Sequence, residues 1–245
     1  ALLLLLDSFE HYTGAIPFLL TLLKAAPHCA LLVTSLHPLN VRQEWVMRLN
    51  GLETPAPDVT DARLVDSVRL FDELARRRGI AGALSDAQLP AVLEICRAVN
   101  GLPLGIELAV ASLPHVGGLE RTASSMQTLA QWLHQTIDPA DAMLSDLPPR
   151  HRGFRRVFDA AWRLLTDEEQ CALATLSIFH TPFSAPAAAA VLNAPLSARV
   201  HNLLERLTER SLLHYTAGDA FQMHDLVCRF AREKLEALPN PLQAV

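Results

Sequence analysis

Two short apolar runs each end in side chains that can bind a metal ion or a phosphate. Asp7 follows Leu2–Leu6, and Thr34 and Ser35 follow the apolar residues 30–33. Continuous apolar runs of this length are typical of strands buried on both faces of a parallel sheet. Open α/β sheets bind ligands at the carboxyl ends of their strands. A carboxylate there can hold magnesium through its water shell, and hydroxyls can bind a phosphate.

Three further residues are candidates for chemistry. Glu10 lies close enough to Asp7 to be considered as a catalytic base, although a strand or turn can point it away. Pro103 takes the first position of a predicted helix, where its missing N–H costs nothing. His224 begins the last predicted helix, where free N–H groups and the helix dipole favour an anion. A helix start or cap is the structural alternative for both Pro103 and His224.

The elements that must position these residues fall into three predicted domains. Residues 1–57 carry strand, helix and strand, a parallel crossover unit, with a weaker third strand at 45–49. Residues 58–147 are helical, and residues 148–238 contain further helices and a short hairpin around residues 217–219. Residues 239–245 begin a linker to a further region. Helices closed by a two-stranded wing describe a winged-helix domain, and the chain is predicted to be mostly α overall.

Apolar periodicity and capping signals give the helix boundaries. In the first helix of the middle domain the apolar residues recur at spacings of four, three and four, and an arginine run followed by glycine ends it. The face is formed by Leu64, Val68, Phe71 and Ala75, and the end by Arg76, Arg77, Arg78 and Gly79. Arginines in a last turn complement the helix dipole, which is a sufficient role for them. Further helices are predicted at 85–99, 102–113, 154–165, 166–178, 186–192, 196–210 and 225–238. A capping box of Thr166 and Glu169 begins the helix at 166–178.

Composition excludes several functional classes. The formal net charge of −5 gives no global attraction to nucleic acid or anionic lipid. The 4 cysteines form no C-x-x-C pair and the 10 histidines no paired metal spacing, so reduced core thiols are expected and a metal enzyme is disfavoured. No apolar run approaches the roughly 18 residues that span a bilayer. The expected compartment is the cytoplasm, with no membrane partner.

Four short segments, in one order, resemble the signal-transduction ATPases of the STAND class with an NB-ARC module. They look like its Walker B strand, sensor strand, GLPL motif and MHD motif. In that order they are residues 2–11 (LLLLLDSFEH), 31–35 (LLVTS), 101–104 (GLPL) and 223–225 (MHD). The surrounding sequence is most similar to bacterial multidomain regulators whose ATPase precedes tetratricopeptide-type repeats. The resemblance covers nearly the whole chain.

The resemblance implies a fold and a set of ligands. Residues 1–57 become the remnant of a P-loop NTPase parallel sheet, and the cofactor is ADP or ATP with magnesium in the intact parent. It makes Asp7 the magnesium residue, Thr34 and Ser35 phosphate contacts, Pro103 a surface for adenine, and His224 the residue that touches the β-phosphate of ADP.

The chain departs from the family pattern in three places. Ser8 replaces the usual Asp or Asn, and Leu36 replaces an arginine expected to meet the terminal phosphate. The phosphate-cradling motif G-x-x-x-x-G-K-[ST] is absent from the 245 residues. We therefore expect the isolated chain to be inactive as an ATPase. The strand carrying that motif is expected between the two apolar strands, which leaves a gap in the sheet.

Three functions are compatible with these features. The leading hypothesis is a nucleotide-dependent switch, in which ADP closes the three domains together and ATP releases them to self-associate in response to a protein or small-molecule inducer. The first alternative is a DNA-binding winged-helix transcriptional regulator, suggested by arginines at 150, 152, 155 and 156. The mixed charges of residues 199–210 argue against direct DNA contact. The second alternative is a degenerate scaffold that binds no nucleotide.

Overall fold

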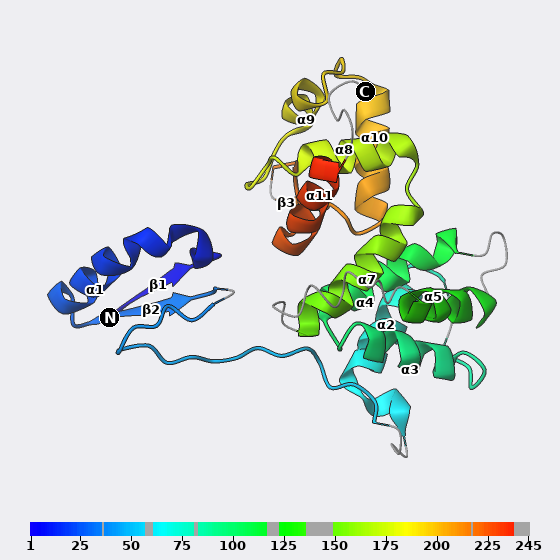
Figure 1. Ribbon diagram of the computed structural model, residues 1–245, viewed down its shortest axis with the longest axis horizontal. Helices are drawn as coiled ribbons and strands as arrows, with labels where there is room; N and C mark the ends of the chain where they lie inside the picture. The colour runs from blue at the N-terminus through cyan, green and yellow to red at the C-terminus, as the bar shows by residue number, and fades with distance from the viewer. Residues whose placement is uncertain are drawn as a thin grey trace. The chain divides into compact units, whose positions relative to one another are not determined.

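The computed structural model describes residues 1–35, 37–56, 61–80, 83–116, 123–135, 149–216 and 218–237. Helices make up most of this part of the chain, and two small sheets complete it (Figure 1), which confirms the mostly α prediction. The chain divides into two compact units, Ala1–Leu49 and Asn50–Val245. The three predicted domain boundaries, at 57/58, 147/148 and 238/239, stay predictions, since all three fall on residues outside the described ranges.

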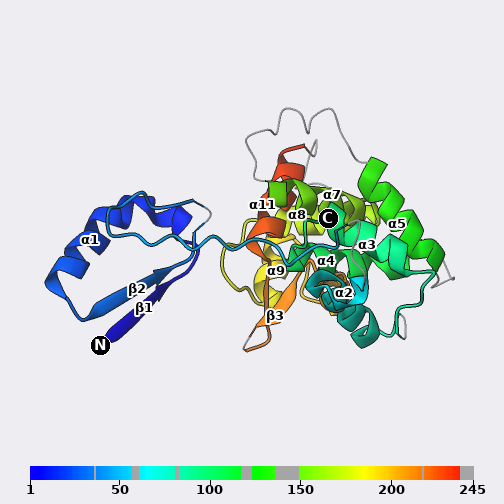
Figure 2. The ribbon, with the colours of Figure 1, turned by 90° about the horizontal axis from the view of Figure 1, so that it is seen from below.

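The first unit has the strand, helix and strand expected from its sequence. Its elements are β1 (Leu2–Leu6), η1 (Phe9–Ala15), α1 (Ile16–Ala25) and β2 (Cys29–Val33). The strands pair in parallel with Leu2 opposite Cys29 and Leu6 opposite Val33. Helix α1 lies alongside both strands in two perpendicular views (Figures 1 and 2). The expected gap between the strands is therefore wrong, because the two strands bond directly to each other.

Two other expectations for this unit are wrong. No strand forms at residues 45–49, where the Trp45 side chain is 98% exposed. A strand needs a hydrogen-bonded neighbour, and the sheet described in this unit contains β1 and β2 alone. The apolar run of β1 is also not buried on both faces, since Leu5 is 68% exposed. One adjacent helix covers only part of a sheet whose residues alternate between two faces.

The second unit begins with a helical bundle. Its elements are η2 (Ala62–Leu64), α2 (Asp66–Arg77), α3 (Leu89–Ala98), α4 (Pro103–Ser112), η3 (Leu113–His115), α5 (Ala123–Gln135) and α7 (Pro149–Arg163). The predicted apolar face of α2 is buried at Val68, Phe71 and Ala75. Leu64 is exposed instead, because the α-helix begins at Asp66 and Leu64 lies in the preceding η2 turn.

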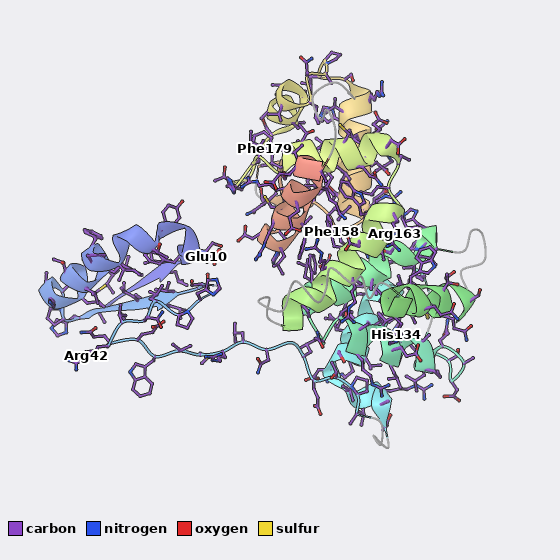
Figure 3. All side chains as sticks on the ribbon, in the orientation of Figure 1. Glu10, Arg42, His134, Phe158, Arg163 and Phe179 are labelled. Atoms are coloured by element: carbon purple, nitrogen blue, oxygen red, sulfur yellow. The ribbon has the colours of Figure 1, made fainter. Side chains whose placement is uncertain are left out.

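Helix α7 connects this bundle with the C-terminal elements. These are α8 (Asp167–Leu176), α9 (Ala185–Val191), α10 (Ala198–Glu209), β3 (His214–Thr216), β4 (Ala220–Gln222) and α11 (Asp225–Ala237). Phe158 of α7, labelled in Figure 3, stacks on Phe230 of α11 with ring centroids 5.8 Å apart. Both rings are buried. These rings belong to one hydrophobic core that continues from the bundle through α7 to the C-terminal elements.

The predicted hairpin forms at the expected place. Strands β3 and β4 are antiparallel, with His214 opposite Gln222 and Thr216 opposite Ala220. Asp219 and Gly218 hold the positive φ angles that a tight hairpin turn requires, 56° and 82°. Phe183 adds a bridge on β4 through two backbone hydrogen bonds of 2.8 Å with Phe221. Three helices and this hairpin thus form one packed C-terminal assembly with α11.

The four cysteines are not joined in disulfides, and Cys96, Cys171 and Cys228 are buried while Cys29 is partly exposed. Burial raises the pKa of the Cys96 thiol to about 12 and also raises the pKa of Cys228. We expect a thiol reagent at neutral pH to modify Cys29 alone in the folded chain, because only thiolates react readily. Mass spectrometry after a short alkylation, with and without urea, checks this. Rapid labelling of Cys96 without urea contradicts it.

In the part of the chain that the structure describes, no helix is both long and apolar enough to span a lipid bilayer.

Candidate functional site

The carboxyl ends of β1 and β2 bring Asp7 and Thr34 together. The Thr34 hydroxyl donates a hydrogen bond to Asp7 Oδ1 and accepts one of 2.9 Å from the Ser8 amide. The Phe9 amide donates to the Thr34 carbonyl at 3.0 Å. Ser8 has φ of 52°, so the chain turns sharply after β1. The carboxylate and the hydroxyl are therefore held in one fixed arrangement at the ligand-binding end of the parallel pair.

Two other predicted residues of the first unit lie near this edge. Ser35 directly follows Thr34, and its hydroxyl oxygen accepts a long hydrogen bond of 3.4 Å from the His37 amide. Glu10 lies in η1, at the end of the unit where β1 finishes (Figure 3). Leu36, the position where an arginine was expected, lies outside the described residues.

The Asp7 arrangement is compatible with magnesium only if water and a nucleotide supply most of the ligands of the ion. Among the described residues no group of three or more His, Cys, Asp or Glu side chains is placed to hold a metal ion. Asp7 with Thr34 supplies one carboxylate and one hydroxyl. Magnesium often keeps several waters and binds through one or two carboxylates together with nucleotide phosphates. Asp7 thus suits a water-mediated ion that arrives with a nucleotide.

Pro103 occupies the first turn of α4, as its sequence position predicts, and is exposed. The preceding Gly101 has φ of +63° and accepts a 2.8 Å hydrogen bond from the Leu52 amide. A Cβ atom on Gly101 would lie 2.1 Å from the Leu52 carbonyl oxygen. The backbone conformation and the close approach of Leu52 therefore explain why glycine begins this Gly-Leu-Pro-Leu segment. The exposed proline is available to a ligand.

His224 caps the helix that follows it. Its Nδ1 atom accepts a hydrogen bond of 3.2 Å from the Leu226 amide, and its carbonyl accepts one of 2.9 Å from Cys228. The ring is exposed, whereas the preceding Met223 is buried. His224 and Pro103 belong to the second unit, and Asp7, Thr34 and Ser35 to the first. The structure thus defines two groups of candidate residues, one in each unit.

The sequence did not reveal how the charges of α10 are distributed. Two arginines of α10 and Arg210 directly after it, at spacings of seven and four, bind the first turn of α8: Arg199 to Glu168 at 2.8 Å, Arg206 to Glu169 at 3.0 Å, and Arg210 to Glu169 at 3.4 Å. Glu205 and Glu209 are exposed as well. The solvent-facing surface of α10 is therefore of mixed charge, and its arginines are already paired with α8 carboxylates. The available signals were the spacing of the arginines and the predicted capping box at Thr166.

Comparison with protein-family models gives no match. Similarity to individual proteins is nevertheless found. A Mycobacterium tuberculosis (strain H37Rv) protein named "Putative HTH-type transcriptional regulator" is 29% identical over 243 residues, which cover 96% of this chain and 25% of that protein. A Mycobacterium bovis protein of the same name gives the same values. An uncharacterized M. tuberculosis protein is 27% identical over 193 residues, 77% of this chain and 44% of its own length.

The chain thus spans about a quarter of the length of the curated regulators that it matches. Their names fit the alternative hypothesis of a transcriptional regulator better than the hypothesis of an ATPase switch. Nearly the full length of this chain is similar to a segment of proteins named as HTH-type transcriptional regulators of mycobacteria.

Proposed function

We propose that the chain is the regulatory segment of a multidomain transcriptional regulator. The observation that carries this proposal is the similarity of 96% of the chain to relatives bearing that name. Those relatives are about four times as long as the matched region, which leaves room for separate DNA-binding and output domains. The mixed charge of α10 and the pairing of its arginines with α8 support a regulatory role for this segment and a DNA-binding role elsewhere.

We further propose that the regulatory signal is a nucleotide. The fixed pair of Asp7 and Thr34 at the carboxyl ends of two parallel strands supports this, as does the resemblance of the four segments to NB-ARC ATPases. Asp7 would hold magnesium through water, Thr34 and Ser35 would contact phosphate, Pro103 would face adenine, and His224 would meet the β-phosphate of ADP. We also propose that the activated parent protein self-associates, and that a protein or small-molecule inducer triggers this change.

The nucleotide proposal is tested in the full-length parent regulator by Thr34→Val. Loss of one charge-assisted contact of this kind is worth about 1.5 to 3 kcal/mol, so ADP affinity should fall roughly ten- to a hundredfold. Thr21→Val is the matched control, because the Thr21 hydroxyl bonds only one turn back within α1, to the Pro17 carbonyl at 2.9 Å. Calorimetry with ADP and magnesium gives the affinity. Equal affinity in the two variants contradicts the assignment.

Direct DNA contact by residues 149–237 is the second candidate function. The order of its elements favours it: α8, the bridge at Phe183, α9, α10 and the β3–β4 hairpin follow one another as in winged-helix domains. The names of the relatives favour direct DNA contact as well. The ion pairs that hold the α10 arginines against α8 oppose it, since phosphate contacts need free cationic groups.

Fluorescence anisotropy with random and genomic duplexes separates the two roles. Phosphate contacts release counterions, so real DNA binding should weaken steeply between about 50 and 200 mM salt. Salt-sensitive nanomolar binding that Arg199→Ala weakens would establish α10 as a DNA reader. Arg69→Ala is the control, because Arg69 is an exposed arginine paired with Asp66 on α2. We expect no such binding by this chain.

A further inference from the structure

An arginine at the end of α2 reaches across the second unit. Arg78 Nη1 donates a 2.7 Å hydrogen bond to the Glu209 carbonyl, at the last residue of α10. Its Nη2 donates to the Ser211 hydroxyl at 2.6 Å. Ser211 in turn donates to Glu107 Oε1 on α4 at 2.9 Å. Each of these three hydrogen bonds joins residues more than a hundred positions apart in the sequence, and together they form one continuous polar chain.

This polar chain connects two groups of elements within the second unit. We call α2–α5 the bundle, and α8–α11 with the hairpin the C-terminal group. In the described part of the second unit, α7 is the helix that packs extensively on both, against α4 and α5 of the bundle and against α11 of the C-terminal group. Away from α7, Arg78 ties the end of α10 directly to the bundle.

Two features favour closure by this contact. A guanidinium at a helix C-terminus satisfies an otherwise unbonded carbonyl and complements the helix dipole. Ser211 has φ of 58°, a left-handed conformation that directs the chain away from α10 and is rare for residues other than glycine. Nearby, His115 of η3 has a pKa lowered by burial and then by the charge of Arg210, which places the α10 end beside the bundle.

Other features make the contact reversible. The Arg78 and Glu107 side chains are 29% and 44% exposed, so water can reach the groups that they release. Separation therefore leaves hydrated polar atoms and not buried orphans, which keeps its cost small. The apolar contacts of α7 with each side are unaffected by it. Breaking the contact should consequently open the unit without unfolding it.

We propose that Arg78, Ser211 and Glu107 form a latch that closes the C-terminal group onto the bundle, and that its release lets the two groups open about α7. This device does not depend on nucleotide or DNA binding. A failed test of the latch would leave the proposed function standing, and a failed test of the proposed function would leave the latch standing.

The latch is tested by distance measurement between spin labels on the full 245-residue chain. Labels are placed at Gln127→Cys on α5 and Asn202→Cys on α10, two exposed positions, in a Cys29→Ala background. We expect Arg78→Gln to raise the population at longer distance roughly tenfold. Arg77→Gln is the matched control, because Arg77 bonds only within α2, to Glu73 at 2.6 and 2.9 Å.

A second variant protects the test against a folding defect. Ser211→Ala keeps the backbone nearly unchanged and removes the hydroxyl that joins Arg78 to Glu107, so it should also lengthen the distances. Circular dichroism identifies the variants that fold. Unchanged distance distributions in every folded latch variant, or the same lengthening in Arg77→Gln, overturn the proposal.

Discussion

Replacing Gly101 by alanine should destabilise the second unit by about 3 kcal/mol or more. The first cause is backbone strain, because Gly101 has φ of +63° and residues with a Cβ atom are disfavoured there. The second is steric overlap, since the new Cβ atom would lie 2.1 Å from the Leu52 carbonyl oxygen and 3.0 Å from its carbon. These are backbone atoms, so the segment at Leu52 must move and lose its hydrogen bond to Gly101.

Gly79→Ala separates the effect of backbone strain from that of steric overlap. Gly79 also has φ of +63°, but a Cβ atom there would meet nothing within 4 Å. Its loss should be about 1 kcal/mol, the cost of the left-handed conformation alone. Urea denaturation followed by far-ultraviolet circular dichroism measures both variants, because nearly all helices belong to the second unit. Equal losses would show that the close approach of Leu52 does not require glycine at 101.

Local features of the fold were predictable from the sequence because they depend on neighbouring residues. The capping box at Thr166 forms as expected, with the Thr166 amide 2.9 Å from Glu169 and the Glu169 amide 3.3 Å from Thr166 Oγ1. Proline begins α4, and the hairpin turns at Gly218-Asp219. Each signal operates within a few residues, where covalent connection already places the interacting groups.

Features that depend on distant segments were not predictable. The strand predicted at 45–49 failed because apolar periodicity does not supply a pairing partner. The arginine run at the end of α2 was expected to complement that helix, and Arg76 and Arg77 do pair one turn back within α2. Arg78 instead reaches Glu209 and Ser211. The candidate site shows the same division. The position of Asp7 and Thr34 at the carboxyl ends of parallel strands was predicted, but the direct pairing of those strands, which brings the two side chains into contact, was not.

Replacing Glu169 by alanine should destabilise the second unit by about 2 to 3 kcal/mol. The carboxylate accepts hydrogen bonds from the Thr166 amide at 2.9 Å and from Arg206 Nε at 3.0 Å, and it pairs with Arg210 at 3.4 Å. Its side chain is 2% exposed, and that of Arg210 is 15% exposed. Truncation thus removes the helix cap and leaves a largely buried arginine without this carboxylate.

The same contacts predict how stability varies with pH. Burial is the largest single influence on Glu169 and raises its pKa, but the Thr166 amide, Arg210 and Arg206 together outweigh it, so the pKa is lowered. A lowered folded-state pKa stabilises the fold above the unfolded-state value of about 4.3. That contribution disappears as the pH falls through the lower folded-state pKa, when the carboxyl group protonates in the folded chain.

Glu169→Gln separates the charge from the shape of this side chain. The amide oxygen can still accept from Thr166, so the loss near pH 7 should be smaller than in Glu169→Ala, and the decline in acid should be shallower than in the wild type. Glu205→Ala is the control, because Glu205 is exposed on the outer surface of α10. Urea midpoints at about pH 7, 5 and 3.5, spanning the glutamate titration, measure the profiles. An acid decline in Glu169→Gln as steep as that of the wild type would mean that other carboxylates cause it, and that the charge of Glu169 does not contribute to the pH dependence.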